Sequence, residues 1–153
     1  MPSSMGDFKK LRVWQEAREL TKGVFSVAEN IRGVTGPILR NQLCRAVLSI
    51  PANIAEGSAK SGDREFARFL KIARGSLAEV ESHLIIAVDI GAIREEEQQP
   101  LLEKVGNVSK MLNGFLERIL LSAEVLERAR VPRKSSRTQN SRSAHPVLKA
   151  PSG

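Results

Sequence analysis

Apolar residues recur at helical spacing along most of the chain, and short breaks divide them into four segments. The first apolar face begins at Leu11 and ends at the Gly-Val-Thr-Gly break of residues 33–36. Pro37 then occupies a position that the first turn of a helix tolerates, and the face after it extends to Ile54. Pro51 lies inside this second run, where a proline removes one backbone hydrogen bond. The pattern predicts two helices, the second of them kinked at Pro51.

Two more helices are predicted in the second half of the pattern. Residues 57–62 form a polar connection, and Asp63 after it is predicted to be the N-cap of a third helix that ends before Gly91. Acidic residues 95–97 suit the first turn of a fourth helix, because carboxylates favour the positive end of the helix dipole. The last apolar face continues to Leu120. With no strand pattern and no repeat, the sequence predicts an all-α protein, an antiparallel up-down four-helix bundle.

The charge and composition change after residue 128. The chain of 153 residues has 24 Lys and Arg against 17 Asp and Glu, a net charge of +7, but residues 129–153 hold six basic residues and no acidic one. Residues 1–128 are therefore nearly neutral. The last segment is also rich in Ser and Pro and poor in apolar residues, which predicts disorder. We expect a flexible N-terminus at 1–7, the bundle at 8–128 and a disordered basic tail at 129–153.

The composition argues against several classes of function. Five Phe, one Trp and no Tyr argue against modules that stack rows of RNA bases on aromatic rings. One Cys and two His offer no nucleophile with a base beside it and no metal site, so we expect neither an enzyme nor a cofactor. No apolar run approaches the roughly 18 residues that cross a bilayer, and the first residues have no signal-peptide core. The expectation is a cytoplasmic protein without membrane contact.

Cations on the predicted third helix are candidates for phosphate binding. Four of them fall within about 120° of the helix surface, opposite the apolar face, where they could meet successive backbone phosphates. The alternative is an ordinary solvated face, and the tail likewise is either a nucleic-acid-binding arm or a solubilising extension. The candidate nucleic-acid-binding residues are Arg64, Arg68, Lys71, Arg74, Arg130, Arg133, Lys134, Arg137 and Arg142.

A second polar stripe lies on the predicted second helix. Arg45, Ser49, Asn53 and Glu56 project from one side of it, and Pro51 shapes the same stretch. The stripe is either a ligand site or a hydrogen-bonded surface against a neighbouring subunit. We favour the structural interpretation, because nothing in the stripe pairs a nucleophile with a base.

Several segments of the chain resemble, in the same order, those of the bacterial 23S rRNA intervening-sequence proteins. They are FKKLRVWQEA (8–17), SIPANIAEG (49–57), EF, RFL and IARGSLAEVE (within 65–81) and KMLNG (110–114). The resemblance covers about residues 8–121 and leaves out the tail. It implies a left-handed four-helix bundle and a ring-like homopentamer. Related accessory proteins of diversity-generating retroelements work with a reverse transcriptase and RNA.

Two hypotheses about function follow. The first is a non-enzymatic homo-oligomer, a pentamer by resemblance, that binds RNA or DNA mainly by charge. The alternative is a protein-interaction scaffold, such as an accessory subunit of a reverse transcriptase.

Overall fold

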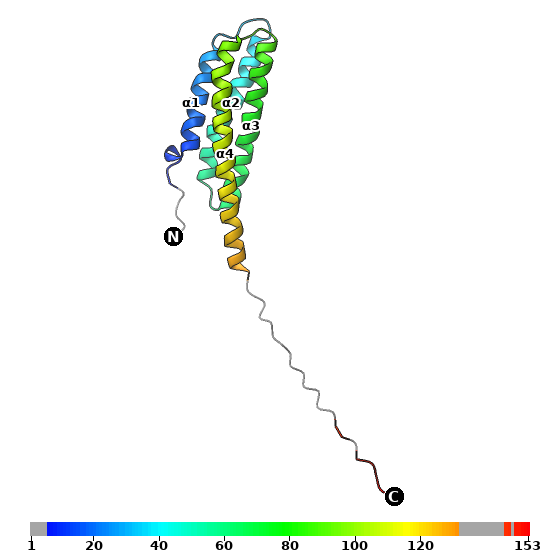
Figure 1. The fold of residues 1–153 in the computed structure, drawn as a ribbon. Helices are drawn as coiled ribbons and strands as arrows, with labels where there is room; N and C mark the ends of the chain where they lie inside the picture. The colour runs from blue at the N-terminus through cyan, green and yellow to red at the C-terminus, as the bar shows by residue number, and fades with distance from the viewer. Residues whose placement is uncertain (1–5, 132–145, 148) are drawn as a thin grey trace.

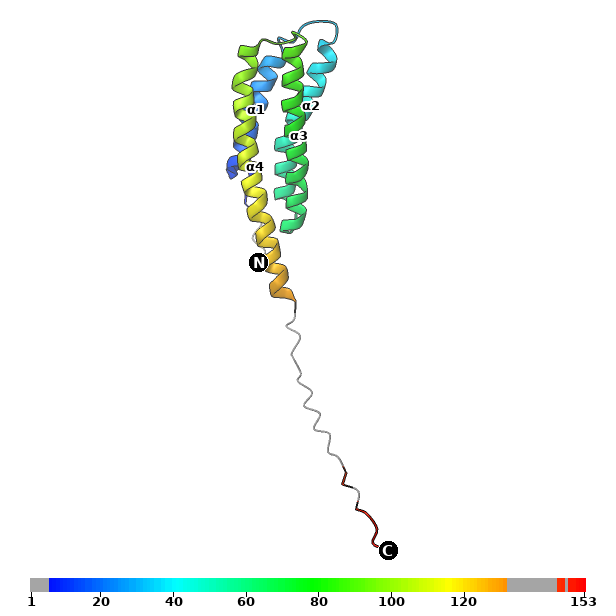
Figure 2. The ribbon, with the colours of Figure 1, turned by 45° about the vertical axis from the view of Figure 1, so that its right-hand side comes forward.

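Four helices form one bundle. The computed structural model describes residues 6–131, 146–147 and 149–153. The elements are a short 3₁₀ helix η1 (Phe8–Lys10) and the helices α1 (Arg12–Ala28), α2 (Gly36–Ser58), α3 (Asp63–Asp89) and α4 (Glu95–Arg130). Helices α1 and α3 each pack against both α2 and α4, so the four enclose a single core. Figures 1 and 2 show the chain reversing direction at each connection. The all-α bundle is confirmed, with no strand in the described residues.

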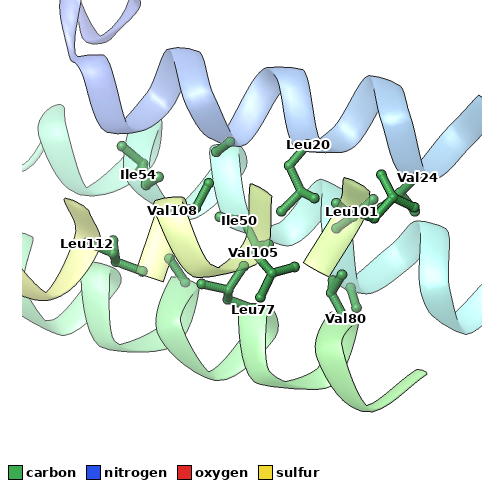
Figure 3. Packing of buried hydrophobic residues seen from close by; sticks show 14 of the residues in the cluster. Leu20, Val24, Ile50, Ile54, Leu77, Val80, Leu101, Val105, Val108 and Leu112 are labelled. Atoms are coloured by element: carbon green, nitrogen blue, oxygen red, sulfur yellow. The ribbon is translucent and has the colours of Figure 1, made fainter. Parts of the chain in front are cut away.

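The core consists of the apolar faces that the sequence pattern predicts. Leu20, Leu43, Ile50, Leu84 and Leu112 have no exposed surface, and Figure 3 shows side chains from all four helices meeting along the bundle axis. Burial of such side chains contributes roughly 1.5–3 kcal/mol each, which makes this packing the main source of stability. Every buried side-chain polar atom in the described residues has a hydrogen-bond partner.

Helix α1 ends earlier than predicted. It stops at Ala28 rather than at the 33–36 break, and the chain leaves it through a turn in which Asn30 N–H donates to Val27 O over 3.0 Å. Ile31, beyond the helix end, is only 4% exposed. The apolar spacing therefore continued past the helix, because a side chain in the turn also packs into the core.

The connection between α2 and α3 is shorter than predicted. Gly57 and Ser58 are buried in the last turn of α2 and not in a polar loop. A Cβ at Gly57 would lie 2.7 Å from Phe66 Cδ2 and from Phe69 Cβ, so glycine lets α2 approach α3 here. The predicted cap was also wrong. Gly62 occupies the N-cap with φ 104°, and Asp63 is the first helical residue, where its charge still favours the dipole.

The end of α3 and the start of α4 agree with the prediction. Gly91, with φ 73°, follows α3, and the N–H of Ala92 donates to Ala87 O over 2.8 Å in a Schellman arrangement. Helix α4 starts at Glu95 as predicted, and the carboxylate of Glu97 accepts from the Arg94 N–H at 2.9 Å.

Helix α4 is the longest element, and its end lies outside the bundle. It has 36 residues against 17 in α1, and its last turns extend beyond the other helices in Figure 1. It continues to Arg130, two residues past the predicted boundary at 128. Within the described residues, no helix is both long and apolar enough to cross a membrane.

Candidate nucleic-acid interface

The four predicted cations of the third helix all lie on the exposed side of α3. Arg64, Arg68, Lys71 and Arg74 occupy its first half, while Phe66 and Leu70 between them are buried. The alternation of exposed cations and buried apolar residues places the positive charge on the side away from the core.

Two of these four cations already have carboxylate partners. Arg64 donates to both carboxylate oxygens of Glu127 on α4, with Nη2 at 2.6 Å from Oε2. This hydrogen bond raises the pKa of Arg64 and lowers the pKa of Glu127. Arg68 forms an ion pair with Glu65 at 3.2 Å. A phosphate at either arginine therefore competes with a carboxylate, although both pairs are exposed and screened by salt.

The other two cations, Lys71 and Arg74, form no ion pair with a carboxylate in the described residues. Arg74 donates to Asn113 Oδ1 on α4 at 3.5 Å, the limit of hydrogen-bond length. Lys71 has no ion pair within the described residues. The predicted stripe is therefore one surface in space, but its members differ in how much charge they offer a ligand.

The predicted tail residues are mostly outside the structure's description. Arg130 is the last residue of α4 and so belongs to the helix. Arg133, Lys134, Arg137 and Arg142 lie outside the described residues.

The polar stripe of α2 divides into two parts. Asn53 Nδ2 donates to Ser49 O at 2.7 Å and to its Oγ at 2.9 Å, and the hydroxyl of Ser76 on α3 donates to the same Oγ at 2.8 Å. These half-buried groups join α2 to α3. Arg45 instead contacts Gln42 within α2, and Glu56 pairs with Lys60 just beyond the end of the helix. Only Ser49 and Asn53 therefore take part in packing between helices, while Arg45 and Glu56 are exposed.

Helix α2 continues through Pro51, and a hydroxyl of another helix lies near the carbonyl that the proline leaves without its usual donor. Proline has no N–H to give to Val47 O, its partner one turn earlier. The hydroxyl of Thr21 on α1 lies 3.4 Å from that oxygen and 2.8 Å from Ala17 O, within donating distance of both. Sequence reasoning missed Thr21, because the contact joins residues 26 positions apart.

Part of the outer surface of α2 is apolar. Residues 46–55 contain no charged residue. Leu48 is 50% exposed, and Phe25 of α1, which borders the same groove, is 39% exposed. A helix that lacks charge on its outward side is typical of one that has a further neighbour.

Charge is separated along the α3–α4 pair. One end, formed by residues 64–74 and 106–130, has eight cations and four carboxylates; we call it the basic end. The other, residues 79–105, has two cations and seven carboxylates and is the acidic end. Its carboxylates are Glu79, Glu81, Asp89, Glu95, Glu96, Glu97 and Glu103. Figure 1 shows α4 leaving the bundle at the basic end.

The side chains that hold metals or act as nucleophiles are few in the described residues. They contain no group of three His, Cys, Asp or Glu side chains placed to hold a metal. Burial raises the pKa of the Cys44 thiol, so this side chain is protonated at neutral pH and a poor nucleophile.

A small pocket at the basic end was not predicted. It has a volume of about 270 Å³ and lies between the start of α1 and the second half of α4. We call it the α1–α4 pocket. Its lining residues are Leu11, Arg12, Val13, Lys110, Met111, Gly114, Phe115 and Arg118.

Comparison with known proteins assigns the chain to a family. A crystal structure from Bacteroides thetaiotaomicron, described as a protein with unknown function from the S23 ribosomal protein family, is similar with a TM-score of 0.62. It is 20% identical and covers 68% of this chain and 97% of its own, which supports the fold alone. No curated protein matches the chain. Residues 9–114, more than half of the sequence, match the family model, and the chain belongs to the 23S rRNA-intervening sequence protein family.

Proposed function

We propose that this protein is a non-enzymatic homo-oligomer that binds RNA or DNA mainly by charge. The observation that carries the proposal is the excess of cations at the basic end, against the excess of carboxylates at the acidic end. A nucleic acid presents a dense row of phosphates, so it is attracted to the first and repelled by the second. Residues 131–153, which follow α4 at the basic end, add five cations and no carboxylate.

Such binding depends little on the base sequence of the nucleic acid. Contacts to phosphate position a nucleic acid but do not read its bases. The exposed cations of α3 stand on a convex helix surface, which suits backbone contacts better than insertion between bases.

The apolar outer surface of α2 supports self-association. A ring of more than two subunits needs two different patches on each subunit. Leu48 with Phe25 offers one, and the exposed isoleucines of α3, among them Ile72 at 42% and Ile86 at 45%, offer a second. Five copies of a 16.8 kDa chain would have a mass near 84 kDa. Light scattering tests this number, and a mass of one chain at every concentration would exclude the assembly.

The test of binding is a salt titration. Fluorescence anisotropy of a labelled single-stranded RNA should show affinity that falls with salt, with a slope of roughly −0.7 for each phosphate neutralised. RNAs of different base composition should bind alike. Absence of binding at low salt contradicts the proposal.

A protein-interaction scaffold, such as an accessory subunit of a reverse transcriptase, is the second candidate. Ile86 and Ile90 are 45% and 53% exposed at the acidic end, next to Asp89. An apolar patch with carboxylates beside it suits a basic protein partner better than a nucleic acid. A reverse transcriptase gene next to the coding sequence, and loss of its binding in Ile86→Ser with Ile90→Ser, would favour this function.

A further inference from the structure

The α1–α4 pocket is lined by three cations from two helices that are far apart in the sequence. Arg12 lies in the first turn of α1, while Lys110 and Arg118 lie on α4. The two α4 cations are eight residues apart, about 12 Å along the helix. This distance is long enough for more than one phosphate group.

The charges of the pocket are not compensated within the described residues. None of the three cations forms an ion pair there, in contrast to Arg64 and Arg68. Glu16, one turn along α1 from Arg12, is half-buried and pairs with none of them. The pocket therefore offers more available positive charge than the start of α3.

Half of the residues that line the pocket have large apolar side chains. They are Leu11, Val13, Met111 and Phe115, and the guanidinium carbon of Arg118 lies 5.8 Å from the centre of the Phe115 ring. A ligand that fits has an apolar, flat part as well as negative charge. The volume of about 270 Å³ lies just below the roughly 300–1,000 Å³ of pockets that enclose whole small molecules. It suits one unit of a polymer.

Gly114 keeps the pocket open. It stands midway between Lys110 and Arg118 on α4, and a Cβ there would meet only Arg118 Nη1, at 3.9 Å. A glycine inside a helix costs up to about 1 kcal/mol relative to alanine, and packing does not require it at this position. A larger side chain at Gly114 would occupy space next to all three cations.

We propose that the α1–α4 pocket binds single-stranded nucleic acid, with its cations on the phosphates and one base against Met111 and Phe115. The inference rests on the proposed function and names a site for it. Charge complementarity selects a polyanion, and the apolar side chains of Met111 and Phe115 favour a nucleotide unit over a carboxylate side chain. Stacking of a base on an aromatic ring tolerates any base, so the site keeps binding independent of sequence.

The first test removes the charge. The variant Arg12→Gln, Lys110→Gln, Arg118→Gln is compared with Arg32→Gln, Arg40→Gln, Lys104→Gln, which loses the same charge near the opposite end of the bundle. With a labelled single-stranded RNA between about 50 and 200 mM salt, the pocket variant should bind about tenfold or more weakly, with a salt slope shallower by about 2. The control should bind within about twofold of the wild type, because screening limits its charges to short distances.

The second test leaves the charge unchanged. Gly114→Leu fills the pocket, and Gly106→Leu places the same side chain elsewhere on α4, where a Cβ has open space. Both changes favour the helix, so circular dichroism should show folded proteins. Only Gly114→Leu should weaken RNA binding, by about fivefold or more if a base occupies the pocket.

Three results would overturn the inference. Equal losses in the two charge variants would show an effect of net charge alone. A pocket variant with altered molar mass by light scattering would show a subunit interface. Oligoglutamate that competes for the pocket as well as RNA of equal charge would show an acidic peptide site. The proposed function fails separately, if the wild-type protein binds no nucleic acid even at low salt.

Discussion

The two ends of the α3–α4 pair share one kind of core and carry opposite charge. At the basic end Phe66 and Leu70 fill the interior, and at the acidic end Val80 and Leu84 do so, all nearly without exposure. Packing therefore needs no charge at either end. The exposed side chains are the ones that differ between the two ends. The core residues hold the bundle together, whereas the exposed residues are the ones available to a partner.

Helix dipoles explain part of the charge at both ends, since Arg128 and Arg130 lie in the last turn of α4, where cations are favoured. Glu95, Glu96 and Glu97 occupy the first turn of α4, where carboxylates are stabilised by the helix dipole, and Glu97 accepts from the Arg94 N–H. Lys71 is in the middle of α3, away from either dipole end, and has no ion pair within the described residues. Its charge is therefore available to a phosphate, as the proposed function requires.

The largest expected effect concerns stability at the basic end. Gly57→Ala places a Cβ within 2.7 Å of Phe66 and Phe69 and should lower the free energy of unfolding by about 1–3 kcal/mol. Gly75→Ala, on the exposed side of α3 with open space around it, should raise it by about 0.5–1 kcal/mol. Urea denaturation measures both. If both variants shift the free energy of unfolding in the same direction, Gly57 is not needed for the close approach of α2 to α3.

The second prediction compares the two ends as binding surfaces. Lys71→Gln with Arg74→Gln should weaken RNA binding by about fivefold at physiological salt, since two phosphate contacts are lost. Glu95→Gln with Glu96→Gln should change it by less than about twofold, because charges separated by much more than the Debye length of about 8 Å are screened. Anisotropy titrations give both values. Equal and opposite effects would mean that net charge, not position, controls binding.

A third prediction frees a cation at the basic end. Glu127→Gln removes the carboxylate that Arg64 now contacts. RNA affinity should rise by about twofold to threefold, with a salt slope steeper by up to about 0.7, because Arg64 can then meet a phosphate. Glu117→Gln, which removes a carboxylate that pairs with no cation in the described residues, is the matched control and should have a smaller effect.

The smallest effect is the pH dependence of the same ion pair. Because Arg64 lowers the pKa of Glu127 in the folded protein, the pair stabilises the fold at pH values above the ordinary glutamate pKa of 4.5. That contribution is lost as the pH falls through the lowered pKa. Wild type should therefore melt slightly above Glu127→Gln at pH 7, and the two should converge in acid. A difference that persists in acid would have another cause.

The sequence predicts most of the fold, because the fold depends on short-range patterns. The spacing of residues such as Leu43 and Leu112 places the helix faces, and Gly91 marks the end of α3 through backbone geometry alone. Ile31 misled the prediction of the end of α1, since a buried turn residue has the same apolar character as a helical one. Gln98 is only 7% exposed and donates to Leu84 O at 3.1 Å, and nothing in the sequence around it predicts this burial.

The candidate site was less predictable, because it depends on contacts between distant residues. The sequence placed Arg64 and Lys71 on one face but did not show that Glu127, 63 positions away, pairs with the first of them. Arg12 follows Lys9 and Lys10, and Arg118 stands beside Glu117 on a separate helix, so neither local pattern indicates a shared site. Only the antiparallel packing of α1 and α4 brings them to one pocket.

Crosslinking of the protein to RNA, with the modified peptides mapped by mass spectrometry, tests the central claim most directly. The claim is that nucleic acid binds at the basic end. At physiological salt we predict crosslinks within residues 6–18, 60–78 and 106–131, and no crosslinks within 79–105. Crosslinks spread evenly over both ends, or concentrated within 79–105, would contradict it.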